Sequence, residues 1–201
     1  MYAILSPPCF GRMKSMATTK TRVLVLSAIA IACNIVLGIV TSALKLPLYL
    51  DTIGTVFIAV YAGPWYGAAV GGLTNLLTGI IFSPKDIPFL LVSVAIGLIV
   101  GYVAKKFPYN LVVAIITGLL LSVVAPLIGT PIGIWVYGGL TGTGMDFLVI
   151  WLKQSGNSIF VSSFIPKIIN NLLDKTGTCL LVYFLLKGLP AQYRLRTSVS
   201  K

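Results

Sequence analysis

The stretch Ser162–Lys175, SSFIPKIINNLLDK, places charged and amide side chains inside an apolar segment of membrane-spanning length. Lys167, Asn170, Asn171 and Asp174 follow a spacing of i, i+3, i+4 and i+7, so on a helix they share one face. Ionisable side chains at membrane depth are costly and normally face a bundle interior or a wet cavity. The stretch therefore predicts a polar stripe inside a helical membrane protein, where a small polar ligand would be held.

The composition places the rest of the chain in a membrane as well. Of its 201 residues, 57% are hydrophobic and 9% are charged, whereas soluble domains carry about 25% charged residues. The chain has no Glu and no His, so acid–base catalysis has few groups to use and a His-based metal site is excluded. We predict an all-α integral membrane protein that is not an enzyme and holds no metal or cofactor. The four acidic residues are Asp51, Asp86, Asp146 and Asp174.

Six apolar stretches are expected to form a six-transmembrane-helix bundle. The second is short for a span, which needs roughly 17–25 residues. The fifth contains Pro126 and Pro131, which we expect to interrupt it. In the long connection before the last stretch, FLVIWL (147–152) is expected to form a short interfacial helix and GLTGTGMD (139–146) a flexible outer loop. The six stretches cover residues 23–44, 50–62, 65–82, 87–104, 111–137 and 159–186.

The distribution of charge predicts the topology. With six spans and a cytoplasmic N-terminus, the inner segments hold ten basic residues and no acid, and the outer connections hold three of each. This bias follows the positive-inside rule and places both termini in the cytoplasm. It also argues against nucleic acid as the reason for the net charge of +11. We expect a basic, flexible leader (1–21), a membrane domain (22–188) and a basic cytoplasmic tail (189–201).

The polar stripe has two readings. At about 1.5 Å per residue, Lys167 lies roughly 12 Å inside a helix that begins at Ile159, Asn171 roughly 18 Å and Asp174 roughly 22 Å. In one reading Lys167 and Asn171 contact a ligand from the outer side and Asp174 forms the floor. In the other, the same side chains form a network that holds helices together.

Further polar and aromatic residues are candidates for the same site. Asn75 lies near mid-membrane and either faces the cavity or makes an interhelical hydrogen bond. Asp51 either accepts from a ligand or caps the second helix, where a carboxylate meets unsatisfied amides. Trp135 and Tyr137 follow the proline-containing part of the fifth stretch and are candidates for stacking on a flat ring.

Small residues predict close helix contacts. Gly67 and Gly71 form a small-xxx-small pair, which lets helix backbones approach closely. Ala28 and Ala32 repeat this spacing in the first stretch. Spacing alone favours packing inside the bundle over docking of another membrane protein.

Three stretches are together similar to one known family. They are Ala28-xxx-Ala32, the block LYLDTIGTVFIAVYAGPWYGAAVGGLTNLLTG (48–79) and PKIINNLLDK (166–175). With the six-span size and the basic ends, residues 18–187 resemble the substrate-binding S-component of an energy-coupling factor (ECF) vitamin transporter. The block 48–79 is the most specific. It is similar to members for hydroxymethylpyrimidine or vitamin B6 uptake, in a group that also includes riboflavin-transporter members.

The resemblance implies a mechanism. It implies a six-helix bundle in the bacterial cytoplasmic membrane that captures one vitamin at its outer end. The loop around Leu48 and Tyr49 would act as a gate, and Ala28 and Ala32 would dock a membrane-embedded EcfT subunit. Two cytoplasmic EcfA ATPases would power a toppling motion, which matches the missing nucleotide-binding motif in this chain.

Two hypotheses of different classes follow. In the first, the chain binds a hydroxymethylpyrimidine- or pyridoxine-type ligand, with a riboflavin-type ligand as the alternative. The predicted contacts are Lys167, Asn171, Asn75, Asp174, Asp51, Trp135 and Tyr137. In the second, the chain is a solitary permease driven by protons or sodium, and Asp174 is the coupling carboxylate.

Overall fold

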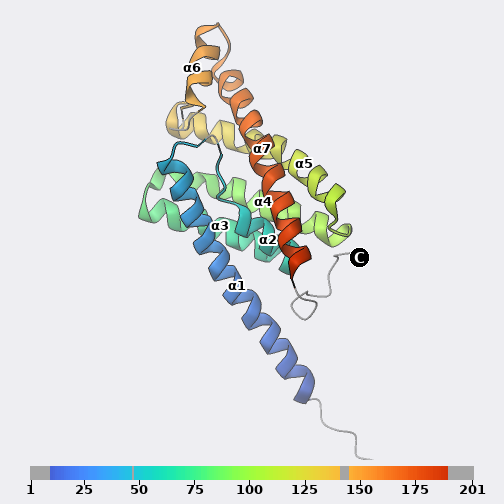
Figure 1. Cartoon of the computed structure of the whole chain (residues 1–201). Coiled ribbons are helices and arrows are strands. Elements are labelled where there is room, and N and C mark those ends of the chain that lie inside the picture. The colour runs from blue at the N-terminus through green and yellow to red at the C-terminus, as the bar shows by residue number, and fades with distance from the viewer. Residues whose placement is uncertain (1–9, 47, 141–144, 190–201) are drawn as a thin grey trace, which may run out of the picture.

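The computed structural model of the chain describes residues 10–46, 48–140 and 145–189, and this part is helix with connecting loops (Figure 1). One short 3-10 helix, η1, precedes α4. The six predicted stretches correspond to α1 to α5 and α7, and the predicted FLVIWL helix to α6. The elements are α1 (Phe10–Ala43), α2 (Ile53–Ala62), α3 (Pro64–Ile81), η1 (Pro84–Phe89), α4 (Leu90–Lys106), α5 (Leu111–Tyr137), α6 (Asp146–Gln154) and α7 (Ile159–Gly188).

Three segments in the described part are long and apolar enough to cross a membrane. They are Lys20–Ala43, Pro84–Lys106 and Leu111–Tyr137. The second predicted span forms a shorter apolar helix, Ile53–Ala62. The six-span count and the side on which the termini lie stay predictions.

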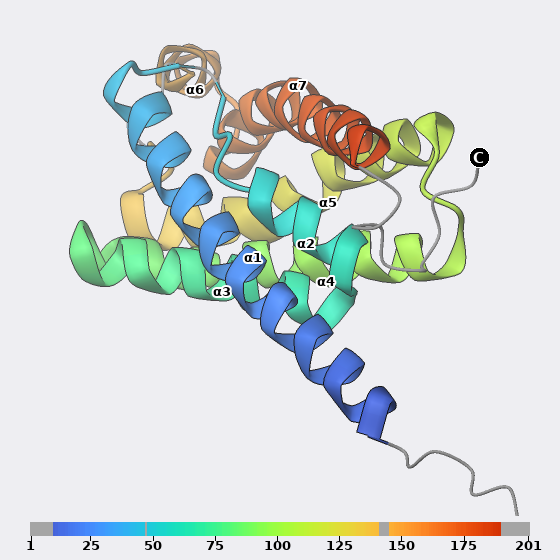
Figure 2. The same cartoon turned by 60° about the horizontal axis from the view of Figure 1, so that its bottom comes forward.

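The helices form one bundle with α2 at its centre. α2 packs against α1, α3, α4 and α7, and most of its residues are buried. α3 pairs with α4, and α5 pairs with α7. Figure 2 shows α1 crossing over α2 and α3 and extending beyond the bundle at its N-terminal end.

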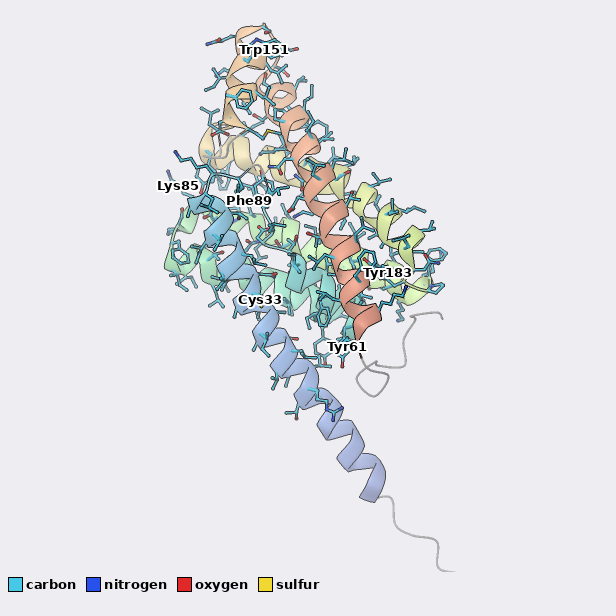
Figure 3. All side chains as sticks on the ribbon, viewed as in Figure 1. Cys33, Tyr61, Lys85, Phe89, Trp151 and Tyr183 are labelled. Atoms are coloured by element: carbon cyan, nitrogen blue, oxygen red, sulfur yellow. The ribbon has the colours of Figure 1, made fainter. Side chains whose placement is uncertain are left out.

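The chain direction defines two ends of the bundle. α1, α3 and α5 run toward one end, where the α1–α2 loop, η1 and α6 lie, and we call it the cavity end. α2, α4 and α7 run toward the other end, which we call the closed end. In Figure 3, Lys85, Phe89 and Trp151 mark the cavity end, and Tyr61 and Tyr183 the closed end.

Glycines allow close helix contacts toward the closed end. A Cβ added at Gly97 of α4 would collide with the backbone of Gly67 in α3. One at Gly101 would meet Pro64, and one at Gly67 would meet Ala59 of α2. The predicted close approach at Gly67 is thus a contact inside the bundle, and it leaves no room for a side chain.

The prediction that two prolines interrupt the fifth stretch is wrong. α5 continues through Pro126 and Pro131, and membrane helices tolerate proline because neighbouring groups take up the freed backbone carbonyls. α1 begins at Phe10, so residues 10–21 of the predicted leader are helical, and the flexibility of the leader stays a prediction. Residues 10–21 contain one glycine and no proline, so no residue there stops the helix. Half of the predicted flexible loop 139–146 (residues 141–144) and nearly all of the predicted tail 189–201 lie outside the described residues.

Candidate binding site

A cavity of about 610 Å³ opens at the cavity end. This volume lies within the range of roughly 300–1,000 Å³ that is usual for small-molecule sites. Its walls come from the end of α1, the α1–α2 loop, α3, η1, α4, α5 and α7. The predicted site and gate residues that line it are Lys167, Asn171, Asn75, Asp51, Tyr137, Leu48 and Tyr49.

The α7 wall presents Lys167, Asn171 and Lys175, spaced one turn apart. Lys167 Nζ donates one hydrogen bond, of 3.4 Å, to the Gly129 carbonyl of α5. Asn171 Nδ2 donates to the Lys167 carbonyl at 2.8 Å. Both side chains are buried from solvent, so their polar atoms face the cavity or the helix itself. An ammonium and an amide at this wall can donate to and accept from a polar ligand.

Asp174 does not line the cavity; the structure places it beside the wall, as a tie between α7 and the α1–α2 loop. Its Oδ1 accepts the backbone N–H of Leu50 at 2.9 Å, and its Oδ2 lies 2.6 Å from Lys175 Nζ. Lys175 Nζ also donates to Thr52 Oγ1 at 2.9 Å. Asp174 and Lys175 therefore connect the predicted gate loop to α7.

The gate loop holds an unusual backbone conformation. Leu50 has a φ of +46°, a left-handed value that L side chains rarely adopt. The hydrogen bond from the Leu50 backbone N–H to the Asp174 carboxylate holds the chain in this turn. Burial, and then the nearby charge of Asp51, raises the pKa of the Tyr49 hydroxyl to about 12, so this phenol stays protonated. The loop thus contributes a neutral phenol and a fixed backbone turn.

Asp51 does not cap α2, so that reading of the sequence is wrong. Thr52 occupies the N-cap position and its side chain makes no capping bond. Asp51 Oδ1 instead lies 3.7 Å from Lys175 Nζ, 124 residues along the chain, and makes no hydrogen bond. The lysine on α7 attracts the carboxylate away from the helix terminus, and Asp51 forms part of the cavity wall.

Asn75 takes on both of its predicted roles. It lines the cavity, and its Nδ2 donates to the Phe89 carbonyl at 3.1 Å and to Ser93 Oγ at 2.5 Å. These bonds join α3 to the start of α4. Its side-chain carbonyl oxygen is the group that is left for a ligand.

A second amide at the cavity was missed by the sequence reasoning. Asn34 of α1 is fully buried, and its Nδ2 donates to Thr55 Oγ1 at 3.0 Å and to Thr74 Oγ1 at 3.3 Å. Its Oδ1 accepts the backbone N–H of Gly54 at 2.7 Å. The sequence did carry a signal for Asn34, because an amide side chain inside an apolar span is costly to bury, as are the polar side chains of α7.

The two predicted aromatic residues of α5, Tyr137 and Trp135, face in different directions. Tyr137 lines the cavity, and its hydroxyl donates to Asp86 Oδ1 at 2.7 Å. Its ring lies 6.3 Å from that of Phe89, which also lines the cavity. Trp135 is 80% exposed and does not line the cavity, so the structure does not bring it together with the other predicted contacts. Residues two positions apart on a helix point in directions that differ by about 200°. Only Tyr137 of this pair therefore faces the cavity.

The predicted docking face on α1 is exposed on the surface of the bundle. Ala28 and Ala32 are both exposed, as is Cys33 beside them (Figure 3). Spacing alone favoured packing inside the bundle, and the structure places this pair on the outer surface instead. The larger exposed side chains around them, Val25, Ile29 and Val36, make this surface apolar.

The comparison with known families identifies the class of protein. The sequence model of the family described as "ECF transporter, substrate-specific component" matches residues 22–186, which include every residue that lines the cavity. No curated protein matches the chain. The chain therefore belongs to the family of ECF transporter substrate-specific components, membrane proteins that bind the transported substrate and work with EcfT and EcfA subunits.

Proposed function

We propose that this protein captures a small water-soluble vitamin or precursor of the hydroxymethylpyrimidine or pyridoxine type in its cavity. The observation that carries the proposal is the α7 wall, where Lys167 and Asn171 line a ligand-sized cavity. Lys167 makes one long hydrogen bond there. Tyr137 and Phe89 offer aromatic surface in the same cavity. Such a cavity suits a flat ring that carries hydroxyl groups and a ring nitrogen.

The proposed setting is the bacterial cytoplasmic membrane, with six spans and both termini inside. The cavity would then open to the outside of the cell. Ala28 and Ala32 would dock the EcfT subunit, and their exposure on α1 supports this role. EcfA ATPases would supply the energy for release of the vitamin to the cytoplasm. Leu48 and Tyr49, which line the cavity from the α1–α2 loop, would open to admit the ligand.

Ligand binding by variants of the full-length chain in detergent tests this site. We expect Lys167→Ala and Asn171→Ala to weaken binding about tenfold to a hundredfold, because each removes a hydrogen bond to the ligand. Mass spectrometry of co-purifying ligand identifies the compound, and calorimetry measures its affinity. Asn157→Ala, outside the cavity in the α6–α7 loop, is the matched control and should bind normally. Unchanged affinity in both cavity variants would remove Lys167 and Asn171 from the site.

Asp174 bears on the rival function, a solitary ion-coupled permease. A coupling carboxylate must gain and lose its ion, whereas both oxygens of Asp174 already hold groups of the protein. Uptake into liposomes separates the functions. We expect uptake only when EcfT and EcfA subunits and ATP are present. Uptake by the chain alone, lost on collapse of an ion gradient, would establish the permease.

A further inference from the structure

Two lysines on the same face of α7 have very different surroundings. Lys175 Nζ lies 2.6 Å from Asp174 Oδ2 and 3.7 Å from Asp51 Oδ1, and it donates to Thr52. Lys167, two turns earlier, makes one hydrogen bond, to the Gly129 carbonyl at 3.4 Å. Both side chains are at least nine-tenths buried. Lys175 is paired directly with carboxylates, whereas Lys167 forms no ion pair within 4.0 Å with a described residue.

No carboxylate of the described residues is in direct contact with Lys167. All four aspartates belong to the described residues, and none forms an ion pair with Lys167 within 4.0 Å. Asp174 and Asp51 face Lys175, and Asp86 accepts from the Tyr137 hydroxyl. Asp146, at the start of α6, attracts Lys167 only at longer range, since it forms no ion pair with Lys167 within 4.0 Å and does not line the cavity.

A buried ammonium without an anion is unfavourable, since burial removes the water that would solvate it. Lys167 lines the cavity, so a ligand there is in reach of its amino group. An anionic oxygen in the cavity would give Lys167 a direct ionic partner, and a charge-assisted hydrogen bond is about twice as strong as a neutral one. Asn171, one turn further along α7, lines the same wall.

We infer that the ligand of this cavity carries an ionised oxygen that pairs with Lys167. The inference rests on the proposed function for the place where the ligand binds, and it narrows the ligand's chemistry. A 3-hydroxypyridine such as pyridoxine has an acidic ring hydroxyl that provides such an oxygen. Hydroxymethylpyrimidine and the riboflavin ring system offer no comparable group near neutral pH, so the B6-type ligand is favoured.

Matched ligands test the inference on the full-length chain in detergent. We expect pyridoxine to bind roughly 30-fold or more tightly than its analogue without the ring hydroxyl. In Lys167→Met this preference should disappear, and in Lys167→Arg, which keeps the charge, much of it should remain. Lys153→Met, an exposed lysine on α6 outside the cavity, should leave the preference unchanged. Calorimetry supplies the affinities.

A second pair of probes separates this inference from the proposed function. Benzoate and benzamide differ in one ionised oxygen, and we expect only benzoate to raise the melting temperature, through Lys167. Tighter binding of hydroxymethylpyrimidine than of pyridoxine would overturn the inference and leave vitamin capture standing. Stabilisation by benzoate without binding of any vitamin would overturn vitamin capture and leave the inference standing. If neither vitamins nor benzoate bind, both fail.

Discussion

The two ends of the bundle are held together in different ways. Toward the closed end, α3 and α4 meet backbone to backbone at Gly67 and Gly97, and the apolar side chains of Val100 and Leu121 are fully buried. At the cavity end the helices surround about 610 Å³ of open space. Separate polar contacts connect them there, such as Asn75 to Ser93. The difference indicates that close packing at one end provides stability, and this allows unfilled space and unpaired polar groups at the other.

The largest expected effect is at Lys175, which lies between the two ends. Lys175→Met leaves Asp174 without its cation in a buried site, and breaking a buried pair costs about 3–5 kcal/mol. We expect a large fall in the melting temperature of the purified chain. The triple variant Asp51→Asn, Asp174→Asn and Lys175→Met removes all three charges and should recover much of the loss. Equal stability of Lys175→Met and the parent chain would show that the charge cluster is not a structural tie.

The polar cluster also shows what the sequence could predict. Charged and amide groups in an apolar chain indicated a cavity, because their burial is costly without partners. The sequence could not show which of them find partners inside the protein. Lys175 and Asp51 are 124 residues apart and meet only because the α1–α2 loop folds onto α7. Asn170 and Asn171 are neighbours in sequence, yet only Asn171 lines the cavity.

The next effect concerns the closed end. Gly97→Ala adds a methyl group where the Gly67 backbone already lies, and overpacking of this kind costs typically about 1–3 kcal/mol. Gly177→Ala on α7 is the control, because its added Cβ meets no atom within 4 Å. Alanine there should leave stability unchanged or raise it by up to about 1 kcal/mol, since glycine is a poor helix former. Thermal unfolding of both variants in the same detergent makes the comparison, and similar losses in both would contradict close packing at Gly97.

The smallest effect is expected at the rim of the cavity, where Tyr137 and Trp135 provide a matched pair on α5. Tyr137→Phe removes the hydroxyl that donates to Asp86, a bond worth about 1.5–3 kcal/mol when the acceptor is charged and less where water replaces it. The ring remains in place, so a stacked ligand loses affinity only through a looser wall, and we expect a loss of a few-fold. Trp135→Phe, on the exposed side of the same helix, should not change affinity at all. If the tryptophan variant binds more weakly than the tyrosine variant, the ligand lies outside this cavity, and the division between a binding end and a closed end would have to be drawn again.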